Sequence, residues 1–370
     1  MQMMMLALLL LLALNSTAAA AAAAYPYAFL DPSISAEARI ADAAKRIDVA
    51  TQINTLQTKH EAGIPGSGVP SSPGYVVLPE YTIETYSTSE CLHGYCSGSN
   101  MTVFAQGITL AASFNALLLR QVGAAIGREA RAVRNEFERT KQLPNKTLTP
   151  NGLACFSPQI NIVRDPRWGR AQETYGECPQ LTSVLAYNYV RGMQGDHPVS
   201  NHLCIGEIPV DRSDTSCLQT YTQTIASPKH YDAYGGATSR GHRSPTEVAL
   251  SWRDWQETFL PQFHSAIAEA GALSTMCSYN TLCICDTYPC SCAAPSHGIP
   301  ACANRELLTV LLREEWNSSA YVVSDAGAIR FVQTDHEYAA SQAEAAAEAL
   351  FAGAVRRCTH MYVLVCPEQA

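Results

Sequence analysis

Segments typical of β-strands alternate with segments typical of α-helices along this chain, and the alternation limits its fold more than any other feature of the sequence. The strand-like segments are short and apolar, and they lie at residues 102–114, 159–164, 223–229, 271–277 and 321–325. The helix-like segments repeat apolar residues at helical spacing or are rich in alanine and glutamate, and they lie at residues 35–56, 115–133, 246–270, 304–315 and 337–352. This order predicts an α/β fold in which a parallel sheet has helices outside it.

Repeated strand–helix units over roughly 320 residues favour a closed TIM (β/α)8-type barrel over an open sheet. With 47% hydrophobic residues, the chain of 370 residues has enough apolar mass for one large core. An open, doubly wound sheet is the alternative. Such a sheet usually carries a glycine-rich phosphate-binding loop, and neither G-x-G-x-x-G nor G-x-x-x-x-G-K-[ST] occurs here.

The first residues have the pattern of a secretory signal peptide. An unbroken apolar run from Met3 to Leu14 is followed by the polar residues 15–17 and then by seven alanines. The run is shorter than the roughly 20 residues that a membrane helix needs. We therefore interpret residues 1–24 as a cleaved signal peptide, with an uncleaved N-terminal anchor as the alternative.

Other features agree with export from the cell. The 14 cysteines predict disulfides, and Asn100, Asn145 and Asn317 begin N-x-[ST] glycosylation acceptors. We expect a secreted glycoprotein of the extracellular space or cell wall, with no membrane contact after signal cleavage. The formal net charge is −8 and no Lys/Arg-rich run occurs, so we expect no nucleic-acid partner.

One strand-like segment leads directly into a carboxylate. Residues Tyr321–Ser324 are followed by Asp325 and then by small residues. In a barrel, the side chains at the carboxyl ends of the strands form the active site. A carboxylate there can trap the oxocarbenium-like state of glycoside hydrolysis covalently, which makes Asp325 a candidate nucleophile. The alternative is that Asp325 only caps the next helix.

Three other places carry candidate residues. Lys229 and His230 end a strand-like segment and can donate hydrogen bonds to sugar hydroxyls or hold a nearby aspartate ionised, although an exposed pair is the alternative. Residues 164–177 are dense in opposite charges, and we expect an ion-paired loop that leaves one guanidinium facing the substrate. Glu90 precedes a turn of small residues and is uninformative when taken alone.

Taken together, these places resemble glycoside hydrolase family 3, in particular its β-xylosidase and α-L-arabinofuranosidase branch. The resemblance runs from about Pro32 to Gly353, and its most specific strings are NIVRDPRWGRAQETYGE and VVSDAGAI. Other matching strings are SECLHG, LAASFNALL, KHYDAYG, DWQETFLPQF, MCSYN and GIPACAN. Their order along the chain agrees with the family.

The resemblance implies a retaining enzyme that needs no metal or cofactor. It implies a barrel domain over residues 25–355. In the family an α/β sandwich domain follows the barrel, and we expect that sandwich domain to be missing here. It implies that Asp325 is the nucleophile. It also implies a sugar-binding subsite formed by Glu90, Arg170, Lys229, His230 and Tyr279.

The sequence departs from the family in three respects. Residues 356–370 diverge from it, and no second carboxylate for acid/base catalysis can be named, because the sandwich domain supplies that group in this branch. Residues 283–297 form a cysteine-rich insert, for which disulfides or an unsettled loop are favoured over a metal site. Cys178 stands before Pro179 where the family usually has a second acidic residue.

The predicted function is that of an exo-glycosidase that releases xylose, with arabinose as a second sugar, from the non-reducing ends of xylan-derived oligosaccharides through a covalent intermediate on Asp325. The alternative is a sugar-binding remnant that lacks the general acid/base. A β-glucosidase or β-N-acetylglucosaminidase is less favoured. The loop KHYDAYGG lacks the histidine that the β-N-acetylglucosaminidase branch carries there.

Overall fold

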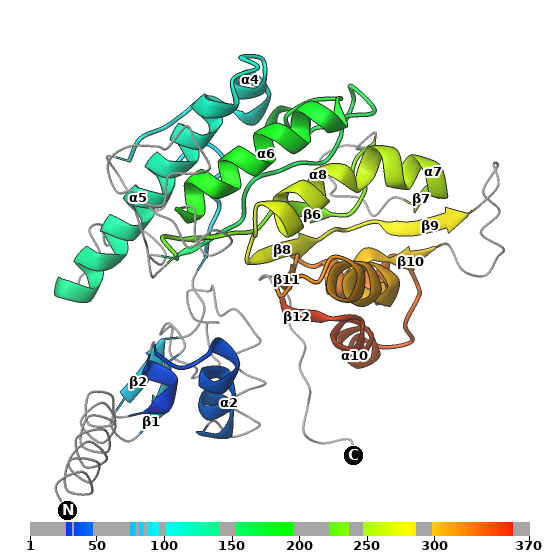
Figure 1. Ribbon diagram of the computed structural model, residues 1–370. Coiled ribbons are helices and arrows are strands. Elements are labelled where there is room, and N and C mark those ends of the chain that lie inside the picture. Colours follow the sequence, from blue (N-terminus) through cyan, green and yellow to red (C-terminus); the bar gives the residue numbers. More distant parts are fainter. Residues whose placement is uncertain are drawn as a thin grey trace, which may run out of the picture. The chain divides into compact units, whose positions relative to one another are not determined.

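The computed structural model describes ten segments of the chain, shown in colour in Figure 1: residues 27–31, 33–46, 75–78, 81–84, 88–95, 101–140, 152–195, 222–236, 247–285 and 298–357. The chain forms two compact units. The smaller contains Met1–Leu56 and Ala62–Thr85, and the larger contains Gln57–Glu61 and Tyr86–Ala370. The predicted signal peptide lies outside the described residues. None of the helices in the described ranges has both the length and the apolar character of a membrane span.

In its described residues, the smaller unit contains two helices and an antiparallel pair of strands. Its elements are η1 (Ala28–Leu30), α2 (Ala36–Arg46) and the antiparallel pair β1 (Tyr75–Leu78) and β2 (Tyr81–Glu84). The Ser35 hydroxyl accepts a hydrogen bond from the Ala38 N–H at 3.2 Å, so it caps α2 as the sequence predicts. The predicted continuation of this helix to Leu56 lies outside the described residues.

The larger unit is built around parallel strands in chain order. One group is β3 (Thr88–Ser89), β4 (Ala154–Cys155) and β5 (Ile225–Ala226), and the other is β6 (Lys229–Tyr231), β8 (Ser274–Cys277), β11 (Tyr321–Ser324) and β12 (Ala354–Arg357). All neighbours in both groups pair in parallel, and a parallel bridge pairs Gln159, which follows β4, with Lys229 at the start of β6. The predicted α/β fold with parallel strands is therefore confirmed.

Helices connect these strands and lie against them (Figure 1). The longer ones are α5 (Ala116–Thr140), α6 (Pro179–Gln194), η6 (Glu306–Glu315) and α10 (Gln342–Ala352). The shorter ones are α4 (Gly107–Ala111), η2 (Ala171–Glu173), α7 (Trp252–Asp254), η3 (Trp255–Phe259), α8 (Pro261–His264), η4 (Ser265–Glu269), η5 (Ala301–Ala303) and α9 (Ala328–Thr334). The predicted cap of α5 is confirmed, because the Asn115 side chain accepts a hydrogen bond from the Leu118 N–H.

Two strand predictions are wrong in part. Residues 102–114 do not form a buried strand, because residues 107–111 form α4 and Val103 is 72% exposed. Gly107 packs directly on the backbone of Glu173, and this tertiary contact outweighs the β-branched composition of the segment. Residues 159–164 are mostly irregular, with pairing only at Gln159.

The start of the predicted helix 246–270 is also wrong. Residues 247–251 form β7 (Glu247–Ser251), and helical structure begins at Trp252. The strand forms because β9 (Thr281–Cys285) pairs with it in parallel, and β9 in turn pairs with β10 (Ile299–Pro300). The predicted break at Pro261 is confirmed, since α8 begins there. The last predicted helix begins at Gln342 rather than Glu337.

The cysteine-rich insert contributes to the sheet formed by β7, β9 and β10. Cys283 and Cys285 lie on β9, and each is disulfide-bonded. Their sulfurs are therefore not thiolate ligands for a metal. Residues 286–297 of the insert lie outside the described residues.

The helices α5 and α6 approach each other closely through glycines. A Cβ atom at Gly192 of α6 would lie 2.1 Å from the Arg120 carbonyl oxygen of α5, and one at Gly123 would lie 2.4 Å from the Tyr189 oxygen. These separations are too short for any side chain. The pair thus fixes α6, whose Tyr189 hydroxyl donates to the Cys91 carbonyl in the segment after β3.

We expect Gly192→Ala to lower the free energy of unfolding by about 1–3 kcal/mol, because the added methyl forces the two helices apart. Urea unfolding followed by circular dichroism measures this change. Ala132→Ser on the exposed side of α5 is the control and should change stability by less than about 0.5 kcal/mol. Equal effects of the two substitutions would contradict the close packing.

Candidate active site

The carboxyl ends of the parallel strands bring the candidate residues together. Asp325 follows β11, and its N–H donates to the Cys277 carbonyl at the end of β8 at 3.1 Å. Lys229 pairs in register with Met276 of the same strand. Parallel pairing therefore places Lys229, His230 and Asp325 at one edge of the sheet.

Asp325 is buried between His230 and Arg170. Its Oδ2 atom lies 3.1 Å from His230 Nε2 and 3.8 Å from Arg170 Nη1, and the side chain is 9% exposed. Its Oδ1 atom accepts a hydrogen bond from the Ala326 N–H at 2.6 Å. Neither contact at Oδ2 has hydrogen-bond geometry, so this oxygen has no donor among the described residues. A buried carboxylate oxygen without a donor is rare and requires an explanation, such as a catalytic role.

His230 is held by Asn161 and by aromatic rings. Asn161 donates to the His230 carbonyl and accepts from the His230 N–H, both at 2.8 Å, so the orientation of its amide is fixed. Its Oδ1 atom also lies 3.3 Å from His230 Nδ1. We therefore assign the ring proton to Nδ1, which leaves Nε2 to accept from Arg170 Nη1 at 3.0 Å.

The charges around Asp325 favour its ionised form. Burial alone would raise its pKa, but the nearby cations Arg170 and Lys229 outweigh burial and hold the pKa well below its ordinary value. Burial and the nearby Arg170 charge lower the pKa of His230 to about 3. The site thus holds an ionised aspartate next to a neutral histidine at neutral pH.

Arg170 is the one guanidinium of the charged loop that reaches Asp325. It forms a two-pronged ion pair with Glu173, with N–O distances of 2.9 and 2.8 Å, and both side chains are largely buried. In contrast, Arg167 pairs with Asp165 at the surface, and Arg164 donates to the Ala233 carbonyl. Arg170 is thus the arginine of the loop that lies beside Asp325, and its predicted contact with the substrate stays a prediction.

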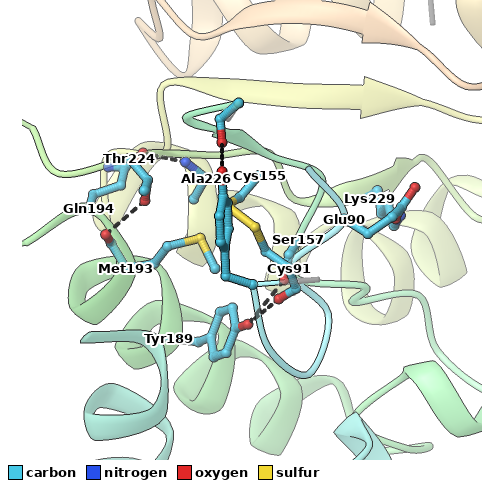
Figure 2. Close-up of a disulfide and its surroundings, with 12 residues drawn as sticks. Glu90, Cys91, Cys155, Ser157, Tyr189, Met193, Gln194, Thr224, Ala226 and Lys229 are labelled. Atoms are coloured by element: carbon cyan, nitrogen blue, oxygen red, sulfur yellow. Dashed lines mark hydrogen bonds and ion pairs between the residues drawn. A yellow bond between two sulfur atoms is a disulfide. The ribbon is translucent and has the colours of Figure 1, made fainter. Parts of the chain in front are cut away.

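Lys229 and Glu90 form the second ion pair of the site. The Lys229 ammonium donates to Glu90 Oε2 at 2.6 Å, and Figure 2 shows the two side chains meeting beside a disulfide. The Lys229 side chain is 3% exposed, whereas that of Glu90 is 59% exposed. A buried ammonium requires such a partner, because an unpaired charge is strongly destabilising in the protein interior.

Tyr279 lies behind His230 rather than in the open part of the site. Its ring stacks on the imidazole at 6.4 Å between centroids, contacts Tyr234 and Phe331, and is 1% exposed. The structure therefore places Tyr279 as a support for His230, and its predicted sugar contact stays a prediction.

Sequence reasoning missed two buried polar residues. Asn161 sets the orientation of His230, and Asp232 accepts hydrogen bonds from the Trp255 indole at 2.6 Å and from the Ala233 N–H. Both lie inside the family-like strings, and this was the available signal. Burial raises the pKa of Asp232 to about 7, against the hydrogen bonds and the charge of Arg164.

No group of three or more His, Cys, Asp or Glu side chains among the described residues is arranged to hold a metal ion. The cations that face Asp325 are protein side chains.

A sequence profile of the glycosyl hydrolase family 3 N-terminal domain matches residues 146–357. The chain belongs to glycosyl hydrolase family 3. Arg170, Lys229, His230, Tyr279 and Asp325 lie within the matched range, and Glu90 lies before it. The resemblance seen in the sequence is therefore confirmed.

Several curated relatives are β-xylosidases by name. The chain is 31% identical to β-xylosidase/α-L-arabinofuranosidase 1 of Medicago sativa subsp. varia, over 88% of this chain and 36% of the relative. It is 31% identical to a xylan 1,4-β-xylosidase of Xylanibacter ruminicola, over 90% of this chain and 33% of the relative. The chain thus spans about a third of the length of the curated relatives it matches.

Two solved glycosidase structures resemble this chain. An exo-β-xylosidase of this family, XlnD, in complex with a xylobiose aziridine activity-based probe, superposes with a TM-score of 0.65 at 28% identity, covering 89% of this chain and 36% of that chain. A β-glucosidase from Erythrobacter marinus superposes with a TM-score of 0.63 at 25% identity, covering 90% and 42%. The domain has a TIM-barrel-like fold in these structures.

We expect His230 to stay neutral from about pH 5 to about pH 8, with its ring proton on Nδ1, because burial and Arg170 oppose a second proton. Nitrogen-15 NMR of the imidazole measures both the tautomer and the protonation state. A midpoint near the ordinary value of 6.5, or a proton on Nε2, would contradict the assignment.

Asp232 gives a prediction for stability. Its pKa is about 7 in the folded protein and near 3.8 when unfolded, so between these values the folded state binds one proton more. Its contribution to stability is therefore present below the unfolded value and is lost as the pH rises towards 7.

We expect Asp232→Asn to gain stability relative to wild type as the pH rises from about 4.5 to about 7, by roughly 1 kcal/mol per pH unit, because asparagine does not ionise. Urea unfolding of both proteins at several pH values measures the difference. A difference that stays constant over this range would show that Asp232 does not titrate there.

Proposed function

We propose that this chain carries the nucleophile and the sugar-binding subsite of a retaining exo-β-xylosidase, which releases xylose, with arabinose as a second sugar, from xylan-derived oligosaccharides. The supporting observation is the state of Asp325. Its carboxylate is buried and ionised, and its Oδ2 atom has no hydrogen-bond donor among the described residues although cations surround it. This is the arrangement that attack on an anomeric carbon requires.

The reaction would proceed in two steps. Asp325 attacks the anomeric carbon, the bond to the leaving oxygen breaks, and water later hydrolyses the glycosyl ester. Arg170 and Lys229 keep the carboxylate ionised before the attack. The Glu90 carboxylate and the Arg170 and Lys229 donors lie where they could bind the hydroxyls of the terminal sugar.

A retaining enzyme also needs a general acid and base. Of the described carboxylates near Asp325, Glu173 is bound to Arg170 and Glu90 is bound to Lys229. We therefore propose that the acid/base lies outside the described residues. The names of the relatives favour xylosides, and the β-glucosidase neighbour makes glucosides the alternative substrate.

Our proposals for the rest of the chain follow the sequence. Residues 1–24 would be a signal peptide, residues 25–355 the family barrel domain with closed β-strands, and residues 356–370 a divergent tail. The protein would be secreted and glycosylated. Asn317 is exposed in the turn between η6 and β11, where a glycan could be attached.

An activated aryl xyloside tests this function without the acid, because its leaving group needs little protonation. We expect 2,4-dinitrophenyl β-xyloside to give a burst of phenol and an enzyme that is heavier by one anhydropentose. Asp325→Ala should abolish both signals. Asp335→Ala, which removes an exposed aspartate after α9, should retain both.

The alternative function is binding without turnover. A protein that binds xylose but gives no burst and no covalent adduct would be a sugar-binding remnant. An adduct on a residue other than Asp325 would contradict the assignment of the nucleophile.

A further inference from the structure

A disulfide involves the residue that directly follows Glu90, whose carboxylate binds Lys229. Cys91 and Cys155 are bonded, and both are fully buried. Cys91 follows Glu90 in sequence, and Cys155 ends β4. Figure 2 shows the bond between these two segments, with Glu90 extending from it to Lys229.

Both neighbours of Glu90 are anchored to the same strand end. Ser89 is in register with Cys155 in the parallel pair of β3 and β4, and its carbonyl accepts from the Phe156 N–H at 2.8 Å. Cys91 is joined to Cys155 by the disulfide. Because the backbone is fixed on both sides of Glu90, the directions open to its side chain are restricted.

The backbone at Cys91 is held in an unfavourable conformation. Its φ angle is 55°, in the left-handed region that residues with a side chain rarely adopt. The Tyr189 hydroxyl from α6 donates to the Cys91 carbonyl at 2.6 Å, and the Ser157 hydroxyl donates to Tyr189. The turn after Glu90 is thus determined by tertiary contacts rather than by local preference.

The exposure of Glu90 shows why this support matters. Its side chain is 59% exposed, so packing does not restrain it, while its partner Lys229 is 3% exposed. Long exposed side chains lose much conformational freedom when they hold one geometry. A fixed backbone on both sides of Glu90 reduces that loss.

We propose that the Cys91–Cys155 disulfide is a positioning element for the sugar-binding subsite: it holds the backbone of Glu90 so that its carboxylate pairs with Lys229 and faces the terminal sugar. This inference rests on the proposed function for the sugar, but its structural part does not. Lys229 also acts on Asp325, so the disulfide supports the charge balance of the nucleophile through Lys229.

Two measurements test the proposal, both on the full chain. The first is the dissociation constant for xylose, measured by calorimetry for wild type, Cys91→Ala/Cys155→Ala, Glu90→Gln and the combined variant. We expect roughly tenfold weaker binding without the disulfide, as for the loss of one charge-assisted hydrogen bond. In the Glu90→Gln background, removing the disulfide should have no further effect.

The matched control is the Cys277–Cys302 disulfide, which does not flank Glu90. Its removal should have the same effect on xylose binding with Glu90 present or replaced. If removing the Cys91–Cys155 disulfide raises the dissociation constant for xylose by the same factor in Glu90→Gln as in wild type, the bond is merely structural and the proposal is wrong.

The second measurement does not depend on sugar binding. Thermal unfolding of Glu90→Gln, Lys229→Met and the pair gives the coupling between the two residues. We expect the shifts in melting temperature of the two single variants to be non-additive in the double variant when the disulfide is present, and additive when it is removed. Coupling that persists without the bond would overturn the proposal, even if wild type binds no xylose and the proposed function fails. Should Cys91→Ala/Cys155→Ala not fold, Cys91→Ala/Cys155→Val, which refills part of the volume, serves in its place.

Discussion

Burial of the ionised Asp325 carboxylate among fixed cations is the interaction on which the rest of the site depends. Taking a carboxylate out of water costs several kcal/mol unless nearby charges offset the loss. Arg170 and Lys229 supply those charges, and each is paired on its other side, with Glu173 and Glu90 respectively. The site is therefore a chain of alternating charges, and moving one member weakens the restraint on the next.

Strand register brings these charges together from distant parts of the sequence. The pairing of β8 with β6 and β11 sets Lys229, His230 and Asp325 at one strand edge, and the loop after β4 brings Arg170 to the same place. Disulfides stand next to two of these strand ends, at Cys91 and at Cys277. The backbone that carries the charged side chains is thus cross-linked where it leaves the sheet.

The sequence predicted the parts of this arrangement that depend on local pattern. The apolar run before Asp325 marked a true strand end, and Asn115 and Ser35 marked true helix starts. The predicted strand over residues 223–229 is wrong in part, because it divides into β5 and β6 and Lys229 begins β6 rather than ending a strand. The errors occurred where tertiary contacts decide the structure. Residues 247–251 form a strand only because an inserted segment pairs with them, and residues 107–111 form a helix against the charged loop.

Side-chain geometry was the least predictable feature. Nothing in the spacing showed that Asn161 orients His230, that Tyr279 packs behind it, or that only Arg170 of the loop's arginines reaches Asp325. These relations depend on which strands are neighbours and on the depth of burial. The family resemblance named the residues. The structure explains how Asp325 is kept ionised and has an oxygen with no donor in the part of the chain that the structure describes.

The most direct test of this account is the ionisation of Asp325 itself. Carbon-13 NMR of the labelled side-chain carboxyl, followed from about pH 8 to about pH 4, should show no change, because the neighbouring cations hold its pKa well below the ordinary value near 3.8. A carboxyl that is half-protonated at about pH 4 or above would contradict the central claim, since Asp325 would then not be held ionised by its surroundings.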